Sequence, residues 1–112
     1  MENISRVSEE KLNKYFDVTG RALKKVKLTE SGSFDWKKAA EDFLDMAQRY
    51  FDDAHRFREK GDLVTAFAAL NYAHGWLDAG ARLGLFDVGA DSELFTVDEE
   101  WVEMLKQNKK TD

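Results

Sequence analysis

Residues 63–77 read LVTAFAALNYAHGWL, a run that contains no Lys, Arg, Asp or Glu. Charged residues make up 35% of the 112-residue chain, so this run differs clearly from its surroundings. If it forms a helix, that helix is apolar nearly all the way round, and helices of this kind are enclosed by other helices or pressed against a second subunit. The run therefore predicts an all-α protein built around a helix that spans about residues 63–83.

The residues before this run predict its packing partner, a helix over about residues 35–60. Apolar side chains recur there at alternating steps of four and three residues, which is a heptad seam. Between the two helices, Gly61 suits the left-handed position that ends a helix, and Asp62 suits the N-cap of the next one. So short a joint predicts a tight antiparallel helical hairpin. The seam consists of Trp36, Ala40, Phe43, Ala47, Tyr50, Ala54 and Phe57.

Two further helices are expected, over about residues 9–27 and 97–107. Ser8 is the expected N-cap of the first, and Thr96 with Glu99 has the form of a capping box before the last. We predict a single domain, residues 1–112, that folds as a compact three- to four-helix bundle, with residues 1–7 and 108–112 flexible. The expected inner stripe of the first helix is formed by Leu12, Tyr15, Phe16, Thr19, Leu23 and Val26.

Composition limits the classes of function that the chain can have. It contains no Cys, which excludes disulfide and thiolate chemistry, and it has no apolar stretch long enough to span a bilayer. Its first residues lack the apolar core of a secretion signal. We therefore expect a cytoplasmic protein without a membrane partner.

The formal net charge of -5 argues against a general nucleic-acid binder, which must neutralise phosphates. One basic cluster lies near the end of the first predicted helix, where cations also complement the helix dipole. Contact with nucleic acid through this cluster stays open as an alternative. The cluster consists of Arg21, Lys24, Lys25 and Lys27.

The sequence shows no specific catalytic or metal-binding motif. Each arm of the hairpin carries one histidine, His55 or His74, whereas a carboxylate-bridged metal site in a four-helix bundle needs two Glu-x-x-His units and further Glu. We therefore predict no metal, no cofactor and a non-catalytic role. The alternative is an enzyme or a small-ligand-binding protein whose pocket is lined by Tyr72, His74, Trp76 and Asp78.

Polar residues form one strip along the predicted helix of residues 63–83, which contains the uncharged run. At a turn of about 100° per residue, four of them fall within about eighty degrees of one another, and Gly75 leaves a notch beside them. Such a strip favours contact with a protein partner or a second copy of the chain, whereas cover by another helix of the same chain is the competing explanation. The residues predicted to make the contact are Phe67, Asn71, His74, Gly75, Asp78 and Arg82. Structural roles are assigned to Gly61, Asp62, Trp76 and Gly84.

Two resemblances concern the hairpin. The hairpin is similar in spacing to a single tetratricopeptide helical hairpin, but no second copy follows at the period of about 34 residues. The residues that carry this spacing are Ala54, Phe57, Gly61, Ala66, Leu70 and Ala73. Residues 50–86, YFDDAHRFREKGDLVTAFAALNYAHGWLDAGARLGLF, resemble the small archaeal all-helical family known as domain of unknown function 357 (DUF357). That resemblance implies a compact helical bundle and brings no established activity.

Overall fold

The computed structural model describes residues 6–29 and 32–110. Over these ranges the chain forms four helices and no strand, which confirms the predicted all-α class. The helices are α1 (Glu9–Lys25), α2 (Trp36–Glu59), α3 (Leu63–Leu83) and α4 (Glu99–Lys110). Residues 1–5 and 111–112, which belong to the ends expected to be flexible, lie outside the described residues.

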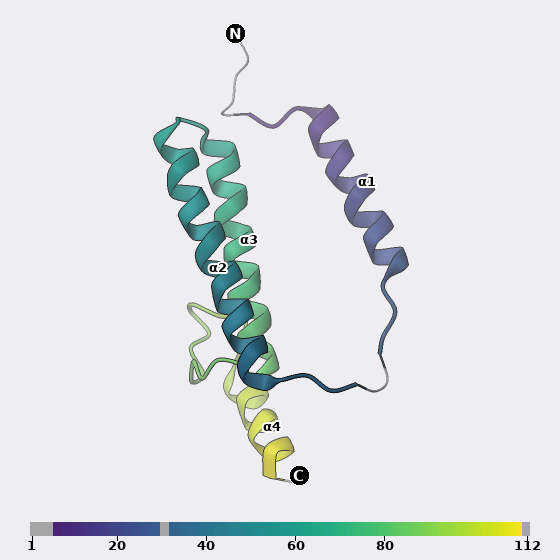
Figure 1. Cartoon of the computed structure of the whole chain (residues 1–112), viewed down its shortest axis with the longest axis vertical. Helices are drawn as coiled ribbons and strands as arrows, with labels where there is room; N and C mark the ends of the chain where they lie inside the picture. The colour runs from purple at the N-terminus through teal and green to yellow at the C-terminus, as the bar shows by residue number, and fades with distance from the viewer. Residues whose placement is uncertain (1–5, 30–31, 111–112) are drawn as a thin grey trace.

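Helices α2 and α3 form the predicted antiparallel hairpin (Figure 1). Small side chains line the seam between them, and Ala47, Ala54 and Ala73 are each buried. Because an alanine projects only one methyl group, the two helix axes approach closely along this seam. The predicted seam therefore forms the core of the protein.

The turn between α2 and α3 has the predicted chemistry. Gly61 has a φ of 81°, a left-handed conformation that glycine adopts without steric cost. Its N–H donates to Arg58 O at 3.0 Å, and the Asp62 N–H donates to Phe57 O at 2.9 Å, which is the hydrogen-bond pattern of a Schellman motif. The Asp62 carboxylate then accepts from the Thr65 N–H at 3.1 Å and caps α3.

The environment of Asp62 also affects its titration. A hydrogen bond from the Thr65 side chain, a second from the Thr65 backbone and the positive charge of Lys11 together hold the pKa of this carboxyl below its ordinary value of 3.8, although burial opposes them. These contacts favour the ionised form, because both the hydrogen bonds and the nearby cation stabilise a carboxylate.

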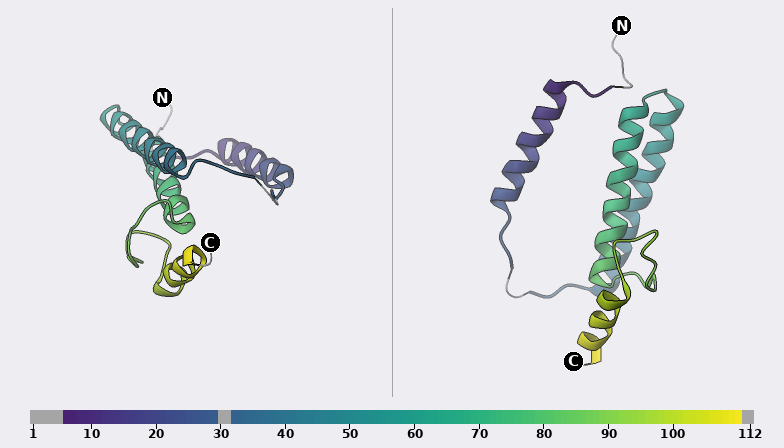
Figure 2. Two further views of the ribbon diagram at one scale, coloured as in Figure 1. Left: turned by 60° about the horizontal axis from the view of Figure 1, so that its bottom comes forward. Right: turned by 180° about the vertical axis from the view of Figure 1, so that it is seen from behind.

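Helix α1 stands apart from the hairpin (Figures 1 and 2). Ser8 caps it as predicted, through a hydrogen bond from the Lys11 N–H at 3.1 Å. None of its residues is buried, so the stripe predicted to face inward is exposed in the single chain. The radius of gyration of 17.4 Å exceeds the roughly 13 Å expected for a compact chain of this length. The bundle is therefore centred on the hairpin, without α1 packed against it.

The chain reverses direction after the C-terminal end of α3. Gly84, with a φ of 84°, ends this helix, and the Leu85 N–H donates to Gly80 O at 2.8 Å. The turn places the Phe86 ring directly over Gly80.

Helix α4 begins with a cap that differs from the predicted one. Asp98 is the residue that caps it, through a hydrogen bond from the Trp101 N–H to Asp98 Oδ1 at 2.8 Å. The capping box predicted for Thr96 and Glu99 is therefore wrong, because the Thr96 hydroxyl donates to Asp78 instead. The start of α4 is fixed to α3 by the Trp101 indole, whose Nε1–H donates to Arg82 O at 2.7 Å.

Candidate interaction surface

A groove runs along one side of the hairpin, between α2 and α3. It has a volume of about 440 Å³. Alanines form its floor, and larger apolar side chains, among them Phe51 and Phe67, form its walls. The residues that line it are Leu44, Ala47, Gln48, Phe51, Phe67, Leu70, Asn71, Ala73, His74 and Leu77.

The groove exists because the two sides of the hairpin are filled differently. On the other side, aromatic rings from the two helices meet edge to face, with centroid distances of 5.0 Å for Phe43 and Trp76 and 4.4 Å for Tyr50 and Tyr72. Such pairs close that side with large, well-packed rings. No comparable pair of rings spans the groove in the described part of the chain, so Phe67 remains 67% exposed.

The exposure of the groove bears on one explanation of the uncharged run, cover by other helices of the same chain. Leu63, Phe67 and Leu70 all belong to this run, and all three are exposed in the single chain. Enclosure of α3 by the other helices of its own chain therefore does not hold for this part of the helix. Exposed apolar grooves without charged side chains are a general feature of interaction sites.

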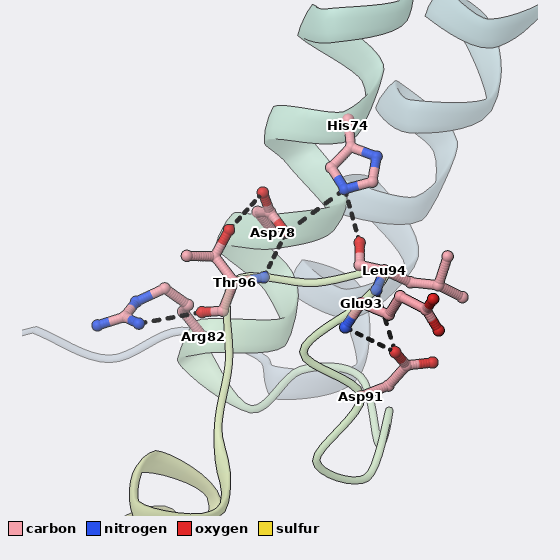
Figure 3. Close-up of polar contacts among 7 residues, drawn as sticks. All are labelled: His74, Asp78, Arg82, Asp91, Glu93, Leu94 and Thr96. Carbon is pink, nitrogen blue, oxygen red and sulfur yellow. Dashed lines mark hydrogen bonds and ion pairs between the residues drawn. The ribbon is translucent and has the colours of Figure 1, made fainter.

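The loop of residues 91–96 is bound to α3 next to His74, which lines the groove (Figure 3). His74 Nε2 lies 2.7 Å from Leu94 O, and since a carbonyl oxygen only accepts, this nitrogen donates. Asp78 accepts twice from Thr96, from its N–H at 2.9 Å and from its hydroxyl at 2.8 Å. Arg82 Nη1 donates to Thr96 O at 3.0 Å. One helix face thus holds three backbone groups of the loop, the carbonyl of Leu94 and both the N–H and the carbonyl of Thr96.

These contacts divide the residues that were predicted to bind a partner. His74, Asp78 and Arg82 hold the loop of the same chain, whereas Phe67 and Asn71 line the open groove. Gly75 lies away from the groove and lines a shallow depression on another face of α3. A Cβ atom built at Gly75 meets no neighbouring atom within 4 Å, so the notch predicted there is open.

Sequence reasoning missed the partners of this polar strip. Thr96 and Leu94 lie 18 and 20 residues from the side chains that bind them, and Trp101 lies 19 residues from Arg82. Local spacing carries no information about contacts of this range. The only available signal is the regular step of four residues from His74 to Asp78 and Arg82, which places three polar groups in one row.

The four residues predicted to line a ligand pocket do not converge. His74 faces the groove and the loop, whereas Tyr72 and Trp76 line the shallow depression together with Ala79. Asp78 is occupied by Thr96. Within residues 6–29 and 32–110, no three His, Cys, Asp or Glu side chains are grouped in a way that would hold a metal ion.

Helix α1 carries a second exposed surface. Its stripe includes Phe16, which is 71% exposed, and Leu23, which is also exposed. On one flank of the stripe the helix periodicity places Lys11, whereas Lys14 and Lys25 lie toward the opposite face. The basic cluster predicted near the end of this helix is exposed, and its Arg21 pairs with Asp17 at 3.0 Å. None of the helices in the described part of the chain has both the length and the apolar character needed to cross a bilayer.

A hairpin of two long antiparallel helices, with one helix attached at each end, defines a small all-α helical protein. The chain belongs to the family described as protein of unknown function (DUF357), whose family model matches residues 14–86. The match covers more than half of the chain, from within α1 to Phe86, and it confirms the resemblance noted for residues 50–86. No curated protein and no solved structure matches the chain significantly.

Proposed function

We propose that this protein is a non-catalytic helical module that associates with a second copy of itself through the groove between α2 and α3. The observation that supports the proposal is the exposure of Phe67 and Leu70 on a helix stretch without any charged residue. On a helix that faces water, charged side chains are expected at such positions. Their replacement by Phe and Leu is explained if another chain covers the groove.

The area of the molecular surface supports the same proposal. One chain exposes 9649 Å², whereas a compact monomer of its mass exposes roughly 6,300 Å². The excess is roughly 3,300 Å² for each chain, or roughly 6,600 Å² for two copies together. Obligate homodimer interfaces bury about 2,000–5,000 Å² summed over both partners, so the single chain leaves open at least as much area as such an interface needs.

The polar residues beside the groove favour a binding role over a catalytic one. His74 and Asp78 are the titratable groups nearest to its lower end, and both are engaged with backbone or hydroxyl groups of the loop. A general acid or base must instead have a free position within hydrogen-bond reach of a substrate. The proposal therefore assigns these side chains to positioning the loop.

Sedimentation velocity over a concentration series tests the proposal. We expect the unmodified chain to form dimers. We expect Phe67→Ala to raise the dissociation constant of the dimer by at least tenfold. The Phe67 ring is 67% exposed in one chain, and a symmetric dimer would bury it twice, once in each copy. Leu83→Ala is the matched control, since Leu83 is a 44% exposed side chain on the same helix outside the groove.

Circular dichroism of the variants shows whether the helices are intact. A chain that stays monomeric at all concentrations would rule out the proposal. So would a Phe67→Ala variant that remains helical and associates as strongly as the Leu83→Ala control.

A further inference from the structure

We propose that the groove of one chain is filled by helix α1 of the second copy, so that the two chains exchange their first helices. This inference rests on the proposed self-association and names the segment that occupies the groove. Each chain carries both halves of the contact, an exposed apolar groove and an exposed apolar helix. An exchange of this kind is a common route to dimers because it reuses elements that the chain already has.

The position of α1 argues for exchange rather than for closure within one chain. In Figures 1 and 2, α1 and the segment of residues 85–98 lie on opposite sides of the hairpin. The groove is on the side of that segment, because His74, which lines the groove, binds Leu94 O. The α1 helix of the same chain therefore stands on the side away from the groove.

Helix α1 is longer than the groove and can therefore fill it along its whole length. Helix α1 has 17 residues and is therefore about 25 Å long. The lining residues on α3 extend from Phe67 to Leu77, which corresponds to about 15 Å along that helix. The segment of residues 26–35 spans at most about 35 Å when extended, enough for α1 to reach an adjacent chain.

The charges at the edges of the two surfaces are complementary. Gln48 lines the groove and donates to Asp52 Oδ1 at 3.0 Å, so Asp52 lies directly beside the rim. Glu41 precedes Gln48 by seven residues and shares this flank of α2. One flank of the α1 stripe carries Lys11 instead. Opposite charges at the rim of an interface fix its register and accelerate association.

Single-cysteine variants test the exchange, because the natural chain contains no Cys. Thr19→Cys labels the stripe of α1, and Asn71→Cys labels the rim of the groove, where both side chains are exposed. The two variants carry tags of different size, are unfolded and refolded together, and are treated with a flexible bismaleimide that spans two packed helices. Ala79→Cys is the matched control for Asn71→Cys, because it lies two turns further along α3 and lines the depression away from the groove.

We expect the mixture of Thr19→Cys and Asn71→Cys to give a cross-linked heterodimer at least five times more abundant than any product of Thr19→Cys with Ala79→Cys. The mixture joins the labels only if α1 of one chain lies on the groove of the other. Dimers in sedimentation without this heterodimer would overturn the exchange and leave the proposed self-association intact.

Two other results would also overturn the exchange. If Asn71→Cys alone cross-links as readily as the mixture, the two grooves face each other. If a chain that carries both cysteines cross-links only within itself, α1 has closed over its own groove. A monomer at every concentration would remove the proposed function together with this inference.

Discussion

The contact between Phe86 and Gly80 makes a sharp prediction about stability. A Cβ atom at Gly80 would lie 2.2 Å from Phe86 Cε2 and 2.7 Å from Phe86 Cδ2. Both distances are more than half an ångström shorter than any ordinary carbon contact, so the ring must leave its place in Gly80→Ala. Overpacking of this kind costs about 1–3 kcal/mol, and the better helix propensity of alanine recovers up to about 1 kcal/mol.

Gly75→Ala is the matched control for this effect. Gly75 also lies inside α3, and a Cβ atom there meets no neighbour within 4 Å. The control therefore gains the same helix propensity without the clash, and we expect it to be more stable than the unmodified chain by up to about 1 kcal/mol. We therefore expect Gly80→Ala to be less stable than Gly75→Ala by about 1–3 kcal/mol, and this difference measures the clash with the Phe86 ring.

Urea unfolding followed by circular dichroism, at one fixed protein concentration, measures both variants. In a Phe86→Ala background the ring is absent, and Gly80→Ala should then stabilise the chain as Gly75→Ala does. Equal unfolding free energies for the two single variants would refute the placement of Phe86 over Gly80.

The remaining predictions concern the caps and the loop. The pKa of Asp62 is lower in the folded chain than in the unfolded chain. Its stabilising effect is therefore fully present at a pH above the unfolded pKa and is lost as the pH falls through the folded pKa. The free energy of unfolding of the unmodified chain, measured with urea, should exceed that of Asp62→Ala by less and less as the pH falls from neutral to about pH 3. Gly84→Ala forces a side chain into a left-handed conformation and should cost about 1 kcal/mol or more, measured as a lowered melting temperature. Asp78→Ala leaves Thr96 without its acceptor, so amide hydrogen exchange at Thr96 should become at least tenfold faster, whereas Asp87→Ala should leave it unchanged.

Much of the hairpin could be predicted from the sequence because the decisive information is local. The turn residues Gly61 and Asp62 stand next to each other, and each has one conformational role. The seam repeats at heptad spacing within one helix, so its inward face follows from periodicity alone. For the same reason Ser8 and Gly84 could be assigned to helix ends without knowledge of the rest of the fold.

The position of α1 could not be predicted in this way. An apolar stripe shows that one face of a helix avoids water, but it does not show which surface covers that face. The stripe of α1 was assigned to the interior of its own bundle, whereas the structure leaves Phe16 and Leu23 exposed. The identity of the covering surface depends on contacts between distant segments, or between chains, that periodicity does not encode.

The polar strip of α3 was recognised, but its partners were not. Three of its side chains turn out to hold the loop, and Thr96, expected to cap α4, donates to Asp78 instead. A hydroxyl near a helix start has two uses, as a cap or as a donor to a distant carboxylate, and sequence spacing favours the first. Asp98, which lies closer to the helix start, takes the capping role because its carboxylate reaches the Trp101 N–H.

The mass of the unmodified chain in solution, measured by sedimentation equilibrium, decides most directly whether a second molecule covers the groove. Association predicts a mass that rises with concentration to twice the 12.9 kDa of one chain. A constant mass of one chain, up to concentrations at which weak dimers are populated, would mean that Phe67 and Leu70 face water without a partner copy, and self-association would be contradicted.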